Sequence, residues 1–172
     1  MPAYILLLRA VNVGGTGKLP MAKLKAMCED AGFAKVRTYI ASGNVVFESK
    51  LPVRKIRAAI ESRLLAHAGK PVGVHIRSLE EMVAVLKANP FGSFAPNRSV
   101  AIFLEEAPPK SALEEAVGLS GEKLHLGLRE IYVAYGDGMA DSKLRIPAAK
   151  AGTARNMNTV AKLAALAAAI GE

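Results

Sequence analysis

Residues 35–47, KVRTYIASGNVVF, decide the fold that the sequence predicts. Lys35–Ile40 is predicted to form a strand, and Val45–Phe47 begins a second strand. Ser42–Asn44, which separates them, consists of residues that favour turns. The stretch therefore predicts a β-hairpin.

On both sides of this hairpin, apolar residues recur at the spacings of further strands and helices. Before it, a strand is predicted at Tyr4–Leu8 and a helix at Met21–Ala31. After it, a helix is predicted at Val53–Ala68, a strand at Val72–Ile76 and a helix at Leu79–Lys87. In the longest of these helices, the buried side is expected to hold Ile56, Ile60, Leu64 and Leu65. The order β-α-β-β-α-β of the first six elements is typical of a ferredoxin-like subdomain.

The first sheet is expected to be covered on both faces. Ile5–Leu8 and Val45–Phe47 are apolar at consecutive positions, whereas a half-exposed strand alternates apolar and polar residues. We expect helices on one face, and the second half of the chain or another subunit on the other.

The second half repeats part of this pattern after a segment rich in Gly, Pro, Asn and Ser. It is predicted to begin with a strand at Val100–Leu104 and a helix at Lys110–Val117. A hairpin of Lys123–Leu126 and Glu130–Tyr135, a short helix near Ser142–Leu144 and a final helix at Asn156–Ile170 are predicted to follow. We predict an α+β protein of tandem ferredoxin-like (split β-α-β) subdomains, with a degraded second copy and a C-terminal helix. The predicted boundaries are 1–90 for the first subdomain, 91–98 for a linker and 99–172 for the second.

The composition is that of a folded globular protein, because 51% of the 172 residues are apolar and 22% are charged. Lys and Arg number 23 against 15 Asp and Glu, and the net charge of +8 favours polyanionic partners. Cys28 is the only cysteine, and its place in a helical pattern predicts a buried, inert thiol. No signal-peptide pattern or membrane-spanning apolar run occurs, so we expect a cytoplasmic protein without membrane contacts.

Three polar clusters, residues 9–18 (RAVNVGGTGK), 42–44 (SGN) and 153–159 (TARNMNT), are nearly free of carboxylates. Their side chains and backbone N–H groups suit an anionic or hydrogen-bonding ligand. We predict that they form one cleft between the subdomains, with ten ligand-binding residues: Arg9, Asn12, Gly14, Gly15, Lys18, Ser42, Asn44, Arg155, Asn156 and Asn158.

The final helix supports this prediction. At about 100° per residue, its first two turns place one polar stripe on the same side: Arg155, Asn158, Thr159 and Lys162. Thr153 or Asn156 could be an ordinary N-cap. Capping explains one residue of the cluster and leaves the others to be explained.

The sequence lacks the motifs of several other kinds of functional site. Gly14–Lys18 fails the phosphate-loop pattern at both ends, and no Gly-x-Ser-x-Gly motif occurs. The three histidines have no metal-ligand spacing, so no metal site is predicted. An RNA-recognition sheet would need several stacking aromatic residues on its central strands, which offer only Tyr4 and Phe47.

Three segments of the chain, residues 7–15, 37–47 and 154–163, together resemble the bacterial family called domain of unknown function 1697, along essentially the whole length. The resemblance implies tandem ferredoxin-like subdomains and no catalytic residue, because the family has no established activity. The chain departs from the family pattern Thr-Arg-Asn-Trp-Asn-Thr at Ala154 and Met157, where a flexible thioether replaces an aromatic ring.

The sequence thus predicts a protein that binds an anionic or phosphorylated ligand, either a nucleotide or a nucleic-acid backbone, and it identifies no cofactor. Two alternatives stay open. One is an enzyme that acts on such a ligand with a Tyr or Lys as its acid or base. The other is a ligand-free protein whose polar clusters join the two halves as buried hydrogen-bond networks.

Overall fold

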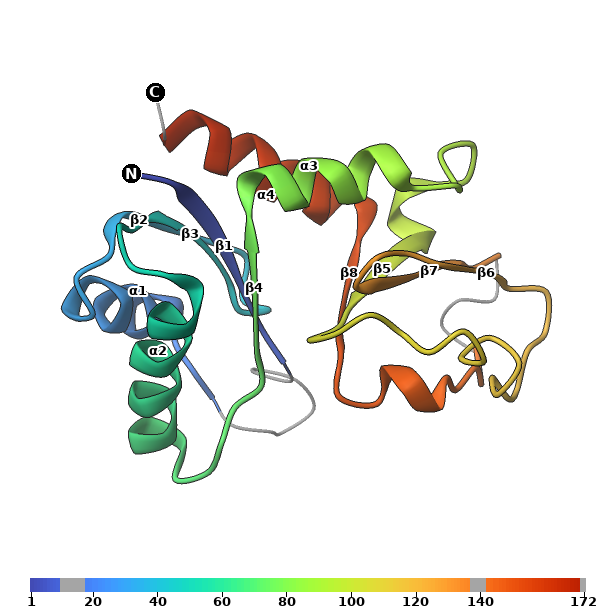
Figure 1. Cartoon of the computed structure of the whole chain (residues 1–172), viewed down its shortest axis with the longest axis horizontal. Helices are drawn as coiled ribbons and strands as arrows, with labels where there is room; N and C mark the ends of the chain where they lie inside the picture. The colour runs from blue at the N-terminus through green and yellow to red at the C-terminus, as the bar shows by residue number, and fades with distance from the viewer. Residues whose placement is uncertain (10–17, 137–141, 171–172) are drawn as a thin grey trace. The chain divides into compact units, whose positions relative to one another are not determined.

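A computed structural model describes residues 1–9, 18–136 and 142–170 of the chain (Figure 1). The chain forms two compact units: unit 1 comprises Met1–Met82 and Lys162–Glu172, and unit 2 comprises Val83–Ala161. Each unit contains one four-stranded antiparallel sheet, so the protein is a mixed α and β fold. Two helices, α3 (Leu79–Ala88) and α4 (Met157–Ile170), begin in one unit and end in the other.

Unit 1 has the chain order β-α-β-β-α-β that the sequence predicts. Its elements are β1 (Ala3–Leu8), α1 (Met21–Asp30), β2 (Ala34–Tyr39), β3 (Asn44–Glu48), α2 (Val53–Ala68) and β4 (Val74–Ser78). The strands lie in the order β2-β3-β1-β4. The predicted hairpin consists of β2 and β3: Tyr39 pairs with Asn44, and Gly43 turns the chain at a φ of 85°, which residues with side chains rarely adopt.

Helices α1 and α2 supply the core of unit 1. Leu6 and Leu8 of β1 belong to one buried cluster with residues of both helices: Leu24, Cys28, Ile56, Ile60 and Leu64. Phe33 and Phe47 stack in this cluster with ring centroids 4.3 Å apart. Burial, reinforced by Glu29, raises the pKa of the Cys28 thiol to about 12, which confirms the prediction of a buried, unreactive cysteine.

The predicted buried side of α2 needs one correction. Leu64 is 0% exposed, whereas Leu65, expected beside it, is 47% exposed. Consecutive residues of a helix are rotated by about 100°, so Leu65 lies outside the stripe that Ile56, Ile60 and Leu64 form.

Strand β1 is buried on both of its faces. Ile5 and Leu7 point away from Leu6 and Leu8 because side chains alternate along a strand, yet all four residues are 0% exposed. The expectation that the sheet is covered on both faces is confirmed for Ile5–Leu8 and for β3, whose residues are all buried. It is not met at β2, where Lys35 and Arg37 are exposed.

The last turns of α4 belong to unit 1 and lie beside β2. Lys35 Nζ donates a hydrogen bond of 3.0 Å to the carbonyl oxygen of Ile170, where an ammonium also favours the negative end of the helix dipole. Lys35 has a φ of 52° within an irregularity of β2, and it forms a 3.4 Å ion pair with Glu48. One side chain thus joins β2, β3 and the end of α4.

Unit 2 repeats the strand order of unit 1. Its strands are β5 (Ser99–Phe103), β6 (Lys123–Leu126), β7 (Glu130–Ala134) and β8 (Thr153–Asn156). They lie in the order β6-β7-β5-β8 across the sheet. When the strands of each unit are counted in chain order, both sheets have the same spatial order, 2-3-1-4. The predicted hairpin of β6 and β7 is confirmed. One face of this sheet packs Val100, Ile131 and Val133 against Ala112 and Ile146.

The helix predicted over Lys110–Val117 is wrong, because this segment forms turns. Glu115 donates to the carbonyl four residues earlier, whereas Ala112 and Ala116 donate to carbonyls three residues earlier. Val117 then pairs with Arg145 through two backbone hydrogen bonds of 2.9 and 2.8 Å. This long-range bridge takes the backbone groups that a continuing helix would need.

The short helix predicted near Ser142–Leu144 is also wrong. A 3-10 helix forms instead at Pro147–Ala149. Proline suits this start because its φ is already helical and the first residues of a helix need no N–H donor.

Strand β8 is an element that the sequence does not predict. Ala154 lies opposite Ile102 and Arg155 opposite Ala101, so the polar cluster of residues 153–159 is a junction between a strand and a helix. Helix α4 begins at Met157, one residue after its predicted start, and its described part ends at Ile170 as predicted.

Neighbouring leucines of α2 provide a test of this core. We expect Leu64→Ala to lower the free energy of unfolding by about 2–5 kcal/mol, because it removes a fully buried side chain and leaves a cavity. The matched change Leu65→Ala, on the exposed side, should cost less than about 1 kcal/mol. Urea denaturation followed by circular dichroism measures both, and equal losses would contradict the assigned packing.

Candidate functional site

Arg9, the start of the first polar cluster, follows directly after the residue that bonds to the Ser42–Asn44 turn at one end of the unit 1 sheet. The N–H of Leu8 donates to the carbonyl of Gly43 at 2.9 Å, and the N–H of Arg9 donates to the carbonyl of Gly73 at 2.9 Å. Gly73 approaches Arg9 so closely that a Cβ on it would lie 3.0 Å from the Arg9 Cβ. Arg9 is therefore held between the Ser42–Asn44 turn and the chain that enters β4.

Asn44 is a structural residue of this turn. It is 0% exposed, and its Nδ2 donates to the carbonyl of Tyr39 at 3.0 Å and to Ser42 Oγ at 2.9 Å. These bonds close the hairpin and satisfy both donors of the buried amide.

Of the remaining first-cluster residues, Asn12, Gly14 and Gly15 lie outside the described residues. Lys18 is exposed, and its carbonyl oxygen lies 3.1 Å from His67 Nε2 at the end of α2. This contact brings the start of the α1 segment to the C-terminal end of α2.

The third cluster lies in unit 2, where Arg155 is 7% exposed. Its Nη1 donates to Thr153 Oγ1 at 2.6 Å and to the carbonyl of Ala154 at 2.9 Å. Burial lowers the pKa of this guanidinium to about 10, so it stays charged at neutral pH. Asn156 caps α4, since its Oδ1 accepts a hydrogen bond of 2.9 Å from the N–H of Thr159, and Asn158 is exposed.

Unit 1 contains a counterpart of Arg155. Arg77 of β4 pairs with Ile5 of β1, and Arg155 of β8 pairs with Ala101 of β5. Each arginine lies two residues before the first residue of a helix. Each guanidinium also donates from Nη1 to the carbonyl of the residue before it. Arg77 bonds to Ile76 at 3.1 Å, and Arg155 bonds to Ala154 at 2.9 Å. The side chain after each arginine caps the helix.

The cap of α3 is a reciprocal pair. Ser78 Oγ accepts from the N–H of Glu81 at 3.1 Å, and Glu81 Oε1 accepts from the N–H of Ser78 at 2.9 Å. The sequence Arg-Ser before α3 and Arg-Asn before α4 was the available signal for this repeat.

A groove of about 340 Å³ in unit 1 gathers cations that the sequence analysis did not combine. Its basic residues come from three elements: Lys25 from α1, Arg37 from β2 and Lys162 from α4. All three are exposed, and the described residues that line the groove include no carboxylate. Within the described part of the chain, none of these three side chains forms a hydrogen bond or an ion pair.

The other residues of the groove add hydroxyl groups and apolar surface. Thr38 and Tyr39, which bear hydroxyl groups, and Val36 and Leu166, which are aliphatic, complete the described lining. Arg37 and Tyr39 share a face of β2, since residues two apart in a strand point the same way. The groove can therefore hold an anionic group on its cations and an apolar portion on Tyr39 and Leu166.

Among residues 1–9, 18–136 and 142–170, no three His, Cys, Asp or Glu side chains gather in a way that could hold a metal ion. In the same ranges, every helix is too short or too polar to cross a membrane.

Comparisons with known proteins agree with this fold. A family model described as "Protein of unknown function (DUF1697)" matches residues 1–132. A solved structure titled "The structure of conserved bacterial protein SP0830 from Streptococcus pneumoniae" is 26% identical, with a TM-score of 0.78. The match covers 96% of this chain and 98% of that one. No curated protein matches.

Replacing Asn44 tests whether this amide is structural. Asn44→Ala should lower the free energy of unfolding by about 1–3 kcal/mol, because it leaves the partly buried carbonyl of Tyr39 without this donor. Ser42→Ala removes only one of the two bonds of the amide and should cost less. Urea denaturation measures both, and an Asn44→Ala protein as stable as the parent would contradict the structural role.

Proposed function

We propose, from the premise that this chain belongs to the DUF1697 family of proteins of unknown function, that the unit 1 groove binds a phosphorylated small molecule. The observation that carries the proposal is the set of three cations that line one groove: Lys25, Arg37 and Lys162. Among the residues that the structure describes, none of the three has an acidic partner. Like charges repel one another, and a bound anion relieves this repulsion.

The chemistry of each residue fits a phosphate ester. Arg37 offers a planar fork of donors that matches two phosphate oxygens, while Lys25 and Lys162 act as mobile point charges. Tyr39 and Leu166 provide surface for a sugar or base. A volume of about 340 Å³ is of the size that small ligands occupy, so a nucleotide is the ligand class that we favour.

A single-stranded nucleic acid is a weaker fit. The aromatic residues on the central strands of unit 1 are unavailable for base stacking, because Phe47 is 0% exposed and Tyr4 packs against the same core. The net charge of +8 would still steer any polyanion toward the protein. Salt dependence separates the two classes, since a nucleic-acid backbone releases many more counterions than one nucleotide.

The alternative of a ligand-free protein accounts for part of the polar clusters. Asn44 closes a hairpin and Asn156 caps a helix, and both roles are structural. It leaves the groove unexplained, because exposed cations without partners add nothing to a buried network. An enzyme that acts on the bound ligand, a cleft between the two halves and a cytoplasmic location stay predictions.

We also propose that the two units are tandem ferredoxin-like folds and that the second copy is degraded. The shared strand order supports this duplication, and so do Arg77 and Arg155 with their helix caps. The degraded parts are the positions of α1 and α2, where unit 2 has the turns after Pro109 and the 3-10 helix at Pro147–Ala149.

Binding of AMP and ADP, with adenosine as the uncharged control, tests the proposed ligand class. Isothermal titration calorimetry at low salt should give saturable binding of both nucleotides, tighter for ADP, and at least about tenfold weaker binding of adenosine. Arg37→Met and Lys162→Met should each weaken ADP binding by about tenfold or more, because each removes one charge-assisted contact.

Lys55→Met is the matched control, since Lys55 is exposed on α2 and does not line the groove. It changes the net charge by the same amount and should leave ADP affinity within about twofold at moderate salt, where distant charges are screened. Equal losses in Lys55→Met and Lys162→Met, or no binding of either nucleotide at millimolar concentration, would overturn the proposal.

A further inference from the structure

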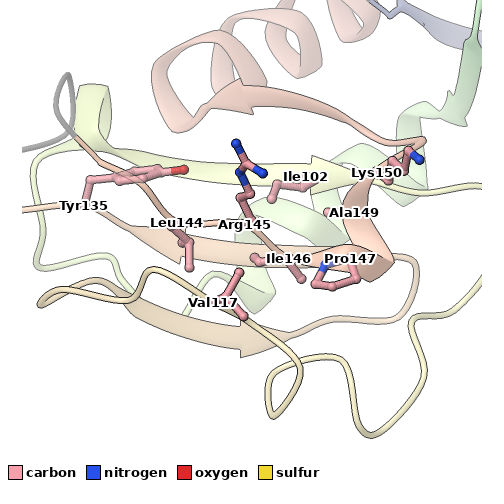
Figure 2. Close-up of a pocket in the computed structure, with 9 residues that line it drawn as sticks. All are labelled: Ile102, Val117, Tyr135, Leu144, Arg145, Ile146, Pro147, Ala149 and Lys150. Carbon is pink, nitrogen blue, oxygen red and sulfur yellow. The ribbon is translucent and has the colours of Figure 1, made fainter.

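Unit 2 contains a second cavity, separate from the proposed nucleotide groove, with a volume of about 490 Å³ (Figure 2). Its wall is aliphatic and comes from β5 and from the segments around Val117 and Pro147: Ile102, Val117, Leu144, Ile146, Pro147 and Ala149. Val117 is 56% exposed, so this apolar surface is open to solvent. An apolar hollow of this size is typical of small-molecule sites.

The walls of the cavity are held by backbone contacts rather than by side chains alone. Val117 and Arg145 exchange two backbone hydrogen bonds of 2.9 and 2.8 Å. Gly118, at a φ of 74°, lies so close to the segment of Arg145 that a Cβ on it would meet the carbonyl oxygen of Lys143. Because the two segments are clamped together, the cavity is formed before any ligand binds.

Three polar side chains line the same cavity: Tyr135, Arg145 and Lys150. Figure 2 shows the Tyr135 side chain extending with its hydroxyl toward Arg145, while the ends of Leu144 and Val117 lie below them in the view. The guanidinium of Arg145 and the hydroxyl of Tyr135 form no hydrogen bond with any other side chain or carbonyl in the ranges that the structure describes.

The charged side chains that line this cavity among the described residues are positive. In the ranges that the structure describes, the lining includes Arg145 and Lys150 and no carboxylate. Glu122, which is not among the described lining residues, accepts hydrogen bonds from the N–H of Ser120 at 2.5 Å and from the hydroxyl of Ser142. These bonds lower the pKa of Glu122, so its carboxylate stays charged near Tyr135. Burial, with the charge of Glu122, raises the pKa of Tyr135, so its phenol stays a neutral donor at pH 7.

We propose that this cavity binds a medium-chain aliphatic carboxylate. The branched aliphatic wall suits an alkyl chain and lacks the aromatic rings that stack on planar ligands, apart from Tyr135. The guanidinium of Arg145 matches the two oxygens of a carboxylate, and the Tyr135 hydroxyl can donate a further hydrogen bond to one of them. Lys150 adds a second positive charge at the rim.

Decanoate, kept below its micelle-forming concentration, is the probe, and decanol is the uncharged control of equal chain length. Calorimetric titration of the full chain should show saturable, one-to-one binding of decanoate and at least about tenfold weaker binding of decanol, because the alcohol makes no charge-assisted bond. Arg145→Met should weaken decanoate binding by about tenfold or more, and Tyr135→Phe by a smaller factor.

Lys123→Met, on exposed β6, is the matched charge control and should bind decanoate as the parent does. Circular dichroism of each variant confirms that it is folded. Equal affinity for decanoate and decanol, unchanged affinity in Arg145→Met, or no saturation by decanoate would each overturn the assignment. None of these results bears on the unit 1 groove, whose probe is ADP.

Discussion

The burial of Ile5–Leu8 on both faces of β1 is the constraint on which the rest of unit 1 depends. Side chains of a strand alternate between two faces, yet Ile5 and Leu7 are as fully buried as Leu6 and Leu8. Helices α1 and α2 account for the face that carries Leu6 and Leu8. Each fully buried aliphatic side chain contributes about 1.5–3 kcal/mol, so leaving a second face in water would remove much of the stability of so small a domain.

The same unit takes in the end of the chain. Residues from Lys162 onward belong to unit 1, and Leu163, Ala167 and Ile170 of α4 are buried. This return of the C-terminal helix brings Lys162 to a groove with Lys25 and Arg37, which lie more than 120 residues earlier. The proposed binding site is thus a consequence of hydrophobic packing, because burial of an apolar helix face fixes where its polar face lies.

Strand β2 is at the edge of its sheet, and its charges serve two purposes. Basic side chains on an edge strand discourage pairing with another chain. Lys35 forms an ion pair with Glu48 and donates a hydrogen bond to the carbonyl of Ile170, whereas Arg37 forms no ion pair among the described residues. The difference between these two neighbouring cations distinguishes a structural charge from one that is available to a ligand.

The sequence predicted the elements whose apolar spacing is regular and missed those that depend on distant partners. Helix α2 matches its predicted bounds because its apolar stripe is clear, and only Leu65 was assigned to the wrong side. Strand β8 carries mostly polar residues, so only its pairing with β5 identifies it as a strand. The segment at 110–117 was predicted to be a helix but forms turns, and it ends at a bridge from Val117 to Arg145 that joins residues distant in the sequence. In the groove, Lys162 was recognised on a polar stripe, whereas Lys25 and Arg37 join it only through tertiary packing.

The most direct test of the central claim is a titration of the isotopically labelled protein with inorganic pyrophosphate, followed by amide chemical shifts. The account predicts that the amides of Lys25, Arg37 and Lys162 shift together and yield one dissociation constant, because their side chains line one groove. Shifts confined to residues outside unit 1, or different dissociation constants at these three positions, would contradict it.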